Sequence, residues 1–209
     1  MSHTILCINS GSSSLKYALY ALDDAEKLLA QGEVARIGLK GGSILLKDGH
    51  GKTLADKLED FPDHLSAVRE MFTLAMEEHR LPAPVGIGQR VVMGGPNHYK
   101  PEIITPELMR ELRKLVPLMP LHIPSEIKGI EAVSKHYPKA KQVACFDTAF
   151  HHRMPEIAKW MPLTRDLWHE GIHRYGFHGL SYEYIVSVLK DRAQGRTIIA
   201  HLGNGASMA

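Results

Sequence analysis

The chain has 209 residues, which is long enough to bury a sizeable hydrophobic core in one large domain or two small ones. Hydrophobic residues make up 44% and charged residues 23%, the composition of an ordinary globular protein. The formal net charge is +2 and no long basic run occurs, so the charge pattern does not indicate a nucleic-acid or anionic-membrane partner.

The start of the sequence and the two cysteines bear on the cellular compartment. The N-terminal residues become polar too quickly for a signal peptide, and no apolar run approaches the length of a membrane-spanning helix. Cys7 and Cys145 each lie in an apolar, strand-like run, which favours two buried thiols over a disulfide. We therefore expect a cytoplasmic protein with no membrane partner.

The first half of the chain predicts mainly strands. Apolar runs separated by glycine-rich turns predict four strands, at 4–9, 15–22, 28–37 and 43–47. The apolar residues of 60–79 recur with helical spacing, and this stretch predicts the first helix.

The second half alternates strands with helices. Strands are predicted at 84–92 and 141–146, and helices at 105–116, 125–137 and 182–192. The last strand, within 196–202, is expected to lack a partner strand, so the segment after about residue 150 is expected to be less ordered. Strands that come first and then alternate with helices predict an α/β fold with a mixed sheet.

A run of small residues, Asn9–Lys16 (NSGSSSLK), joins the first two predicted strands. Glycine lets a ligand approach the backbone closely, and serine hydroxyls add donors, so the run suits phosphate oxygens. Lys16 adds a positive charge, and Asn9 supplies an amide oxygen suited to a metal-bound water. A flexible hairpin loop without a ligand stays open as the alternative from these residue types alone.

A second turn of the same type, in 201–207 (HLGNGAS), follows the last predicted strand. Between the two turns, Asp147 ends the apolar strand at 141–146, which is where α/β proteins usually bind ligands. Two small-residue turns and one carboxylate together favour a nucleotide polyphosphate with magnesium.

A competing motif is His169-Glu170-x-x-His173, which has the spacing of a zinc protease site. That chemistry needs both histidines on one face of a continuous helix, and Gly171 disfavours such a helix. A solvated loop with incidental histidines is the favoured interpretation, and a metalloprotease is kept as an alternative.

Six motifs in the same order resemble the acetate/propionate kinase family. They are NSGSSSLK, RVVMGG, PLHIP, FDTAFHHRMP, RYGFHG and HLGNGAS. The resemblance implies an actin-like, sugar-kinase-like ATPase built from two ribonuclease H-like lobes, of which this chain covers roughly the first half. Residues 1–149 would form the N-terminal lobe and 150–209 an incomplete start of the second. The 209-residue chain by itself would then bind nucleotide weakly and show no turnover.

The resemblance also implies the reaction and its participants. The family transfers the γ-phosphoryl group of ATP directly to acetate or propionate, with Mg²⁺ as cofactor, and forms an acyl phosphate. ATP or ADP and a small carboxylate would be the ligands. The complete protein would be a homodimer.

Roles for individual residues follow from the same resemblance. Arg90 would hold the acceptor carboxylate and the transferring phosphoryl group, and His178 would stabilise the transition state. Asn9 and Asp147 would organise Mg²⁺, with Asp147 as the catalytic acid. The nucleotide phosphates would be bound by Ser12, Ser14 and Lys16 at the first turn and by His201, Leu202, Gly203, Asn204 and Gly205 at the second. The acyl tail would lie against Val92, Leu121 and Phe177. Gly179 would keep the approach to His178 open.

The chain departs from the family pattern at five positions. Gln89 and Met93 stand where the family usually has histidine, and Ile123 stands where it usually has asparagine. Leu180 and Tyr182 replace a usual threonine and histidine. All five are expected near the acyl substrate, so the preferred carboxylate stays open. A catalytically inactive nucleotide-binding module of the same fold is the alternative function.

Overall fold

The computed structural model describes residues 3–23, 25–170, 172–193, 195–203 and 205–209. The chain divides into two compact units. Unit 1 comprises Met1–Val91 and Pro101–Ala144, and unit 2 comprises Val92–Lys100 and Cys145–Ala209. No helix in the described part of the chain is both long and apolar enough to cross a membrane.

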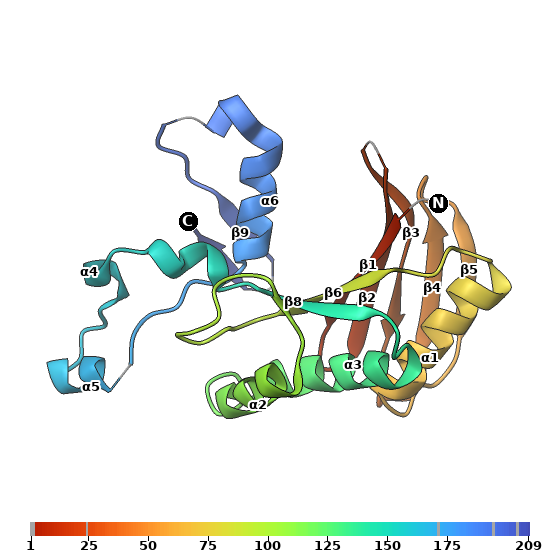
Figure 1. The fold of residues 1–209 in the computed structure, drawn as a ribbon, viewed down its shortest axis with the longest axis horizontal. Coiled ribbons are helices and arrows are strands. Elements are labelled where there is room, and N and C mark those ends of the chain that lie inside the picture. The colour runs from red at the N-terminus through yellow and green to blue at the C-terminus, as the bar shows by residue number, and fades with distance from the viewer. Residues whose placement is uncertain (1–2, 24, 171, 194, 204) are drawn as a thin grey trace. The chain divides into compact units, whose positions relative to one another are not determined.

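Unit 1 is built around one mixed sheet with the strand order β5-β4-β3-β2-β1-β6-β8-β7 (Figure 1). The strands are β1 (His3–Ser10), β2 (Ser14–Leu22), β3 (Glu26–Ala35), β4 (Ser43–Asp48), β5 (Thr53–Leu58), β6 (Gly86–Val91), β7 (Glu102–Ile103) and β8 (Lys141–Phe146). The first five form an antiparallel meander, and β6 runs parallel to β1. The predicted α/β class with a mixed sheet is confirmed.

The sequence did not predict β5 and β7, which are the two edge strands of the sheet. The residues of β5 (TLADKL) are half-buried or exposed along its whole length, so it carries no alternating apolar signal. β7 has only two residues. Both strands form by pairing with a neighbour, through β4 and β8 respectively, rather than by local pattern.

Three helices complete unit 1, and α1 and α3 pack against each other on one side of the sheet (Figure 1). The helices are α1 (His64–Phe72), which continues as the π-helical turn Thr73–Glu78, α2 (Pro106–Leu115) and α3 (Ile123–His136). The core between these layers includes Leu6, Ile8, Leu15, Leu19, Val34, Ile44, Leu46, Val68, Met71, Phe72 and Val133. In β1 and β2 the buried residues alternate with half-buried or exposed ones, so the apolar runs that predicted these strands contribute only every second side chain to the core.

The first helix begins later than its apolar pattern predicted, at His64 instead of Asp60. Asp63 is its N-cap: the Asp63 carboxylate accepts a hydrogen bond from the Ser66 backbone N–H at 2.8 Å. Phe61, just before the cap, is a core residue that is 1% exposed. Its apolar side chain therefore belongs to the core without belonging to the helix.

The cap supplies a testable prediction about stability. Asp63→Ala should lower the free energy of unfolding at pH 7 by about 1 kcal/mol. The Ser66 N–H holds the pKa of the Asp63 carboxyl below its usual value. The stabilisation is therefore present above the pKa of an unfolded aspartate, about 3.9, and is lost as the pH falls through the lower folded-state pKa.

Urea unfolding at pH 7 and at successively lower pH would measure this effect. The difference between wild type and Asp63→Ala should shrink below about pH 4. Asp56→Ala, which removes an exposed aspartate on β5, is the matched control and should change stability little at either pH. A difference that stays constant on acidification would contradict the capping role.

The prediction of two buried thiols is wrong for Cys7, which is exposed. Successive side chains of β1 point to opposite faces, and Leu6 and Ile8 face the core, so Cys7 faces outward. Cys145 is half-buried, and burial raises the pKa of its thiol. An apolar run predicted the strand correctly but not the outward face of that strand.

Unit 2 consists of short elements connected by long irregular segments. Its elements are a 3₁₀ turn (Ala149–Arg153), α4 (Glu156–Lys159), α5 (Arg165–His169), α6 (Gly179–Leu189), a second 3₁₀ turn (Lys190–Ala193), β9 (Ala200–Leu202) and β10 (Ala206–Met208). The predicted helix at 182–192 is present but begins at Gly179. The expectation that the last strand lacks a partner is wrong. The chain reverses after β9, and β10 returns antiparallel to it.

Candidate active site

The turn between β1 and β2, residues 10–14, is held in place by backbone hydrogen bonds. We call it the serine turn. The Gly11 N–H donates to the Ser14 carbonyl at 2.7 Å, and the Ile37 N–H donates to the Ser13 carbonyl at 2.9 Å. Carbonyl oxygens would repel an anion, but these two already accept hydrogen bonds from backbone N–H groups of the chain. The arrangement is compatible with the predicted phosphate contact.

A buried histidine supports the serine turn from α1. The Nε2 atom of His64 lies 2.9 Å from the Gly11 carbonyl oxygen, and His64 is 6% exposed. A third carbonyl of the turn is thus also occupied. Ser12, by contrast, is exposed, so its hydroxyl is accessible to a ligand.

Three of the predicted site residues of unit 1 lie together beside this turn. Asn9 and Lys16 are cross-strand partners on β1 and β2. Arg90 lies on β6, which runs beside β1, and its Nη1 donates to the Asn9 Oδ1 at 3.3 Å. The same Nη1 is 3.9 Å from the carboxylate of Glu126, a residue in the first turn of α3 that is 2% exposed. The guanidinium is therefore oriented from two sides while a quarter of its side chain stays exposed.

Gln89 lies on the other face of β6 from Arg90, because side chains alternate along a strand. Gln89 is 2% exposed, and its Nε2 donates to the Gln142 Oε1 at 2.7 Å. Gln142 in turn donates to the Ser134 hydroxyl of α3 at 2.7 Å. This buried amide chain connects the sheet to α3 and places Gln89 in the interior of unit 1.

In unit 2, Asp147 follows β8 directly and is 3% exposed. Its backbone carbonyl accepts a hydrogen bond from the Gly179 N–H at 2.9 Å, where α6 begins. A Cβ atom on residue 179 would lie 2.2 Å from that carbonyl oxygen. Gly179 is therefore required for close packing of α6 against Asp147, and the open approach to His178 that was expected of it stays a prediction.

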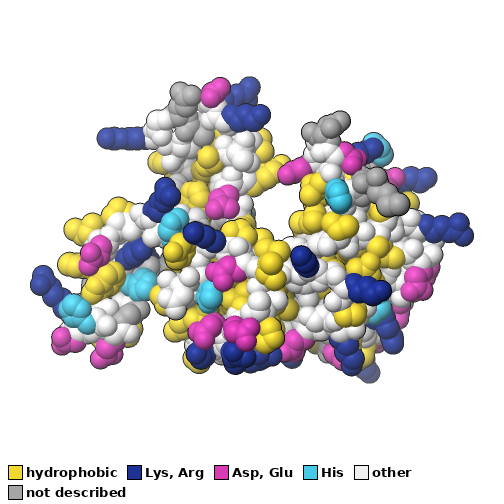
Figure 2. Space-filling model, viewed as in Figure 1, with side chains coloured by type: hydrophobic (Ala, Val, Ile, Leu, Met, Phe, Trp, Pro, Cys, Tyr) yellow, Lys and Arg dark blue, Asp and Glu magenta, His cyan; other side chains and the backbone are white. Residues whose placement is uncertain are grey.

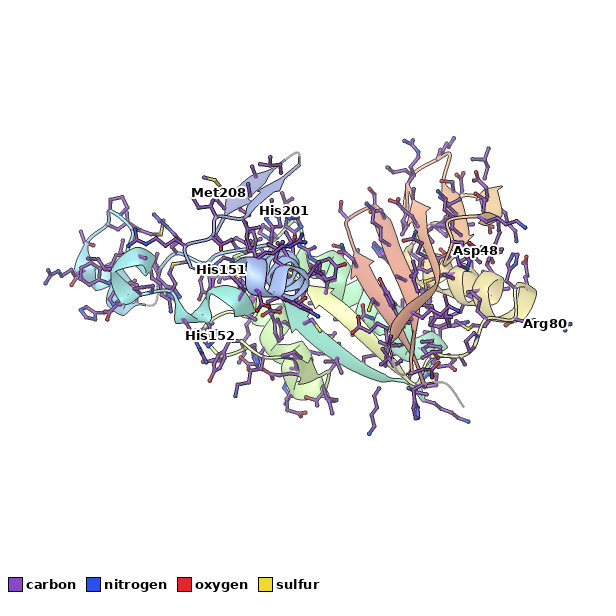
Figure 3. All side chains as sticks on the ribbon, turned by 90° about the horizontal axis from the view of Figure 1, so that it is seen from above. Asp48, Arg80, His151, His152, His201 and Met208 are labelled. Carbon is purple, nitrogen blue, oxygen red and sulfur yellow. The ribbon has the colours of Figure 1, made fainter. Side chains whose placement is uncertain are left out.

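His178, the residue before α6, is fixed by several contacts. Its φ of 59° is in the left-handed region, which is unusual for a residue other than glycine. Its Nδ1 lies 2.7 Å from the Ser207 hydroxyl, and the Tyr182 hydroxyl also hydrogen-bonds to Ser207. The rings of His178 and His201 stack with centroids 4.1 Å apart, and the His201 Nδ1 lies 3.1 Å from the Ser181 hydroxyl. Figure 3 shows His201 on the hairpin beside α6.

The other predicted residues are less closely associated. Leu121 lies in unit 1 and is 78% exposed, whereas Val92 and Phe177 lie in unit 2 and are buried and half-buried respectively. Of the predicted phosphate turn, Leu202, Gly203 and Gly205 are exposed, and Asn204 lies outside the described residues. Within unit 2, the structure groups His178 with His201 rather than with the glycines.

The comparison with protein families decides the family of this chain. The family model described as "Acetokinase family" matches residues 4–209. The chain belongs to the acetokinase family.

Individual acetokinase relatives agree with this assignment. An acetate kinase of Rhodopseudomonas palustris (strain TIE-1) is 41% identical, and the match covers 100% of this chain and 54% of that protein. The crystal structure of Porphyromonas gingivalis acetate kinase matches with a TM-score of 0.86 at 34% identity, covering 99% of this chain and 54% of that one. A propionate kinase structure from Francisella tularensis matches with a TM-score of 0.88 at 32% identity and the same coverages. The chain thus spans about half the length of these relatives.

Four of the five departures from the acetokinase pattern lie in the interior. Gln89, Met93, Ile123 and Tyr182 are each 3% exposed or less, and Leu180 is half-buried. Interior side chains affect packing first, as the Gln89–Gln142 hydrogen bond illustrates. These interior positions are explained by packing alone, so the expectation that all five residues lie near the acyl substrate stays a prediction.

The competing zinc-protease motif does not form one helix. α5 ends at His169, the first residue of the motif, and the ring of His173 contacts Trp168 and Tyr175 instead. Among the residues that the structure describes, no cluster of His, Cys, Asp and Glu side chains is suited to a metal ion. The geometry that the metalloprotease alternative needs is therefore not met.

Sequence reasoning missed three residues that support the site: His64, Glu126 and Ser207. His64 and Glu126 lie far along the chain from the residues that they contact, Gly11 and Arg90. Ser207 lies inside a recognised motif, but its partners are on α6. Each of these three residues is recognised only by its contact in the folded chain, because no local sequence pattern indicates that contact.

Proposed function

We propose that the protein containing this chain transfers the γ-phosphoryl group of ATP to a short-chain carboxylate such as acetate or propionate. A carboxylate oxygen attacks the γ-phosphorus and forms a new P–O bond. The bond to the bridging β–γ oxygen breaks, and ADP leaves with that electron pair. Transfer in line needs mainly positioning and charge neutralisation from the protein.

The observation that carries this proposal is the placement of Arg90. Membership of the acetokinase family makes phosphoryl transfer the leading reaction, and the named relatives are acetate and propionate kinases. The Arg90 guanidinium, oriented by Asn9 and Glu126, is suited to bind a carboxylate or a phosphoryl group in bidentate fashion. Arg90 would hold the acceptor and the transferring group, while Ser12, Ser14 and Lys16 would bind nucleotide phosphates.

Unit 2 would contribute the remaining groups. His178 would donate a hydrogen bond to the phosphoryl oxygens as charge develops on them. His201 and the turn Leu202–Gly205 would contact nucleotide phosphates, and Val92 and Phe177, with Leu121 of unit 1, would contact the acyl tail. The amide oxygen of Asn9 and the carboxylate of Asp147 are the hard oxygen donors that Mg²⁺ prefers, so they fit this ion. When bound, Mg²⁺ would neutralise phosphate charge.

The wider organisation is part of the same proposal. Residues 1–149 would form the first ribonuclease H-like lobe, and residues 150–209 would begin the second. The complete protein would act in the cytoplasm as a homodimer on ATP and a small carboxylate.

A hydroxamate assay of the complete gene product containing residues 1–209 tests this function. ATP, Mg²⁺ and acetate or propionate should yield acyl hydroxamate. Asp147→Asn should lower the rate by at least about 100-fold, because a lost metal ligand removes several kcal/mol of charge stabilisation. Asp166→Asn, an exposed aspartate on α5, is the matched control and should leave the rate unchanged.

The outcome also decides between the two functions. If neither acetate nor propionate yields hydroxamate although the protein binds ATP, the assignment of these carboxylates as acceptors is wrong, and the inactive nucleotide-binding module becomes the favoured function. If Asp147→Asn retains full activity, the proposed magnesium role is wrong.

A further inference from the structure

One hydroxyl group connects His178 to a buried tyrosine. The Ser207 Oγ lies 2.7 Å from the His178 Nδ1 and also hydrogen-bonds to the Tyr182 hydroxyl. Tyr182 is 0% exposed, and its ring packs against the rings of Phe150 and His151. All of these residues belong to unit 2, and Figure 3 shows His151 and His201 near α6. The three polar groups therefore form a continuous chain that ends at the imidazole.

We propose that Tyr182 and Ser207 are positioning residues that set the tautomer of His178, with the ring proton on Nε2. The Tyr182 O–H donates to the Ser207 Oγ, and the Ser207 O–H donates to the His178 Nδ1. Because Nδ1 then acts as an acceptor, the neutral ring carries its proton on Nε2. The benefit for phosphoryl transfer rests on the proposed function, but the tautomer itself does not.

The direction of the chain follows from the chemistry of its members. A phenol is far more acidic than an aliphatic hydroxyl, so it is the better donor of the two. Among the residues that the structure describes, Ser207 is the only hydrogen-bond partner of the Tyr182 hydroxyl. If Ser207 donated to Tyr182 instead, the buried phenol proton would have no acceptor, which is unfavourable. The favoured chain therefore runs from tyrosine to serine to histidine.

Two further contacts restrict the His178 ring. The backbone of His178 is held in the left-handed region, with the next residue bonded to the Asp147 carbonyl. The His201 ring is stacked on His178 with an angle of 10° between the planes. In the β9–β10 register, His201 and Ser207 are direct partners, so one hairpin provides both the stacked ring and the hydrogen-bonding hydroxyl. The ring is thus fixed in tilt by His201 and in tautomer by Ser207.

The tautomer determines what His178 does in the proposed reaction. An imidazole stabilises developing phosphoryl charge only by donating an N–H. With Nδ1 occupied by Ser207 as an acceptor, the donor is Nε2. Without the chain, Nδ1 would lose the donor that holds it as an acceptor, and a larger part of the population would present a lone pair at Nε2 in place of a donor.

Nuclear magnetic resonance of the ¹⁵N-histidine-labelled 209-residue chain tests the proposal without any activity. Long-range ¹H–¹⁵N correlations at pH 8 distinguish protonated from unprotonated ring nitrogens, and His178→Gln identifies the signals. In the wild type, His178 should carry its proton on Nε2 with about a tenfold excess over the other tautomer, as expected for one partly buried hydrogen bond. A wild-type ring protonated on Nδ1 would overturn the proposal with no variant needed.

Variants then assign the effect to the chain. Ser207→Ala should bring the two tautomers toward equal population, Tyr182→Phe should reduce the excess, and Ser207→Thr, which keeps a hydroxyl, should restore it. Ser187→Ala removes a hydroxyl from the exposed face of α6 and should have no effect. An unchanged tautomer ratio in Ser207→Ala would contradict the proposal.

A kinetic measurement on the complete gene product separates this proposal from the proposed function. Ser207→Ala should lower kcat by up to about twofold with little change in KM for ATP, because equal tautomer populations leave about half of the His178 rings with an Nε2 proton, and Ser207→Thr should recover it. If no acyl phosphate forms at all, the proposed function fails, and the tautomer measurement still decides whether the chain of hydroxyls positions His178. An active protein whose kcat is unaffected by Ser207→Ala would overturn the positioning role.

Discussion

Arg90→Ala should reduce kcat/KM for acyl phosphate formation by about 10³-fold in the complete gene product, at the upper end of the loss typical for one removed electrostatic donor. The guanidinium is a charged group of unit 1 that the structure orients from two sides, through Asn9 at 3.3 Å and Glu126 at 3.9 Å. Its removal eliminates the proposed contact to both the carboxylate and the phosphoryl group. The hydroxamate assay measures this loss directly.

Two matched variants control this prediction. Arg90→Lys should recover little activity, because an ammonium group cannot reproduce a planar, bidentate contact. Arg113→Ala removes the same charge from an exposed arginine that pairs with Glu131 on the surface, and it should retain full activity. Thermal unfolding of all three variants detects misfolding. A folded Arg90→Ala protein that retains wild-type activity would exclude Arg90 from the site.

The elements that local chemistry specifies were predictable from the sequence. The first two strands and the serine turn follow from apolar runs that flank glycine and serine, and α2 begins where the helix at 105–116 was predicted, with Thr105 as its N-cap. The edge strands β5 and β7 were not predictable, because half-exposed or very short strands depend on a neighbour rather than on a pattern. Cys7 shows the same limit, since an apolar run does not indicate which face of a strand is covered.

The same distinction, between what local sequence indicates and what depends on the completed fold, applies to the candidate site. The order of the motifs identified Asn9, Arg90 and His178, because a family resemblance assigns roles to residues that local sequence patterns do not single out. The contacts that orient them were beyond sequence reasoning. His64 reaches Gly11 across 53 residues and Ser207 reaches His178 across 29, so both depend on the completed fold. Gly179 also has a packing role that the sequence did not reveal, because a Cβ atom at this position would meet the backbone carbonyl of Asp147.

The backbone amides of unit 2 should exchange with solvent at least about 100-fold faster than those in the centre of the unit 1 sheet, in the 209-residue chain at pH 7. The contiguous core of buried residues from β1, β2, β3, β4, α1 and α3 belongs to unit 1. In unit 2, by contrast, many large apolar side chains are exposed, and Figure 2 shows hydrophobic surface over the part that carries α4 and α5. These side chains include Ile157, Trp160, Met161, Leu163, Tyr184, Val188, Ile198, Leu202 and Met208.

The β9–β10 hairpin should exchange fastest of the regular elements. An isolated two-stranded sheet is marginally stable in water, and the described hairpin strands have three residues each. α6 should be intermediate, because Gly179 and Tyr182 are buried while much of its remaining surface is exposed. The strands β1, β2 and β6 have neighbours on both sides in the sheet, so their amides should open only when unit 1 unfolds.

Hydrogen exchange followed by mass spectrometry measures these rates, and a pair of variants links them to burial. Leu46→Ala truncates a core side chain that is 0% exposed, and it should accelerate exchange throughout unit 1, because the cavity costs about 2–5 kcal/mol. Val188→Ala, at a site 59% exposed on α6, should change exchange in unit 1 very little. If the amides of α6 and the hairpin were as strongly protected as those of β1 and β2, unit 2 would possess a stabilising core of its own, and the ranking argued from exposed apolar side chains would be wrong.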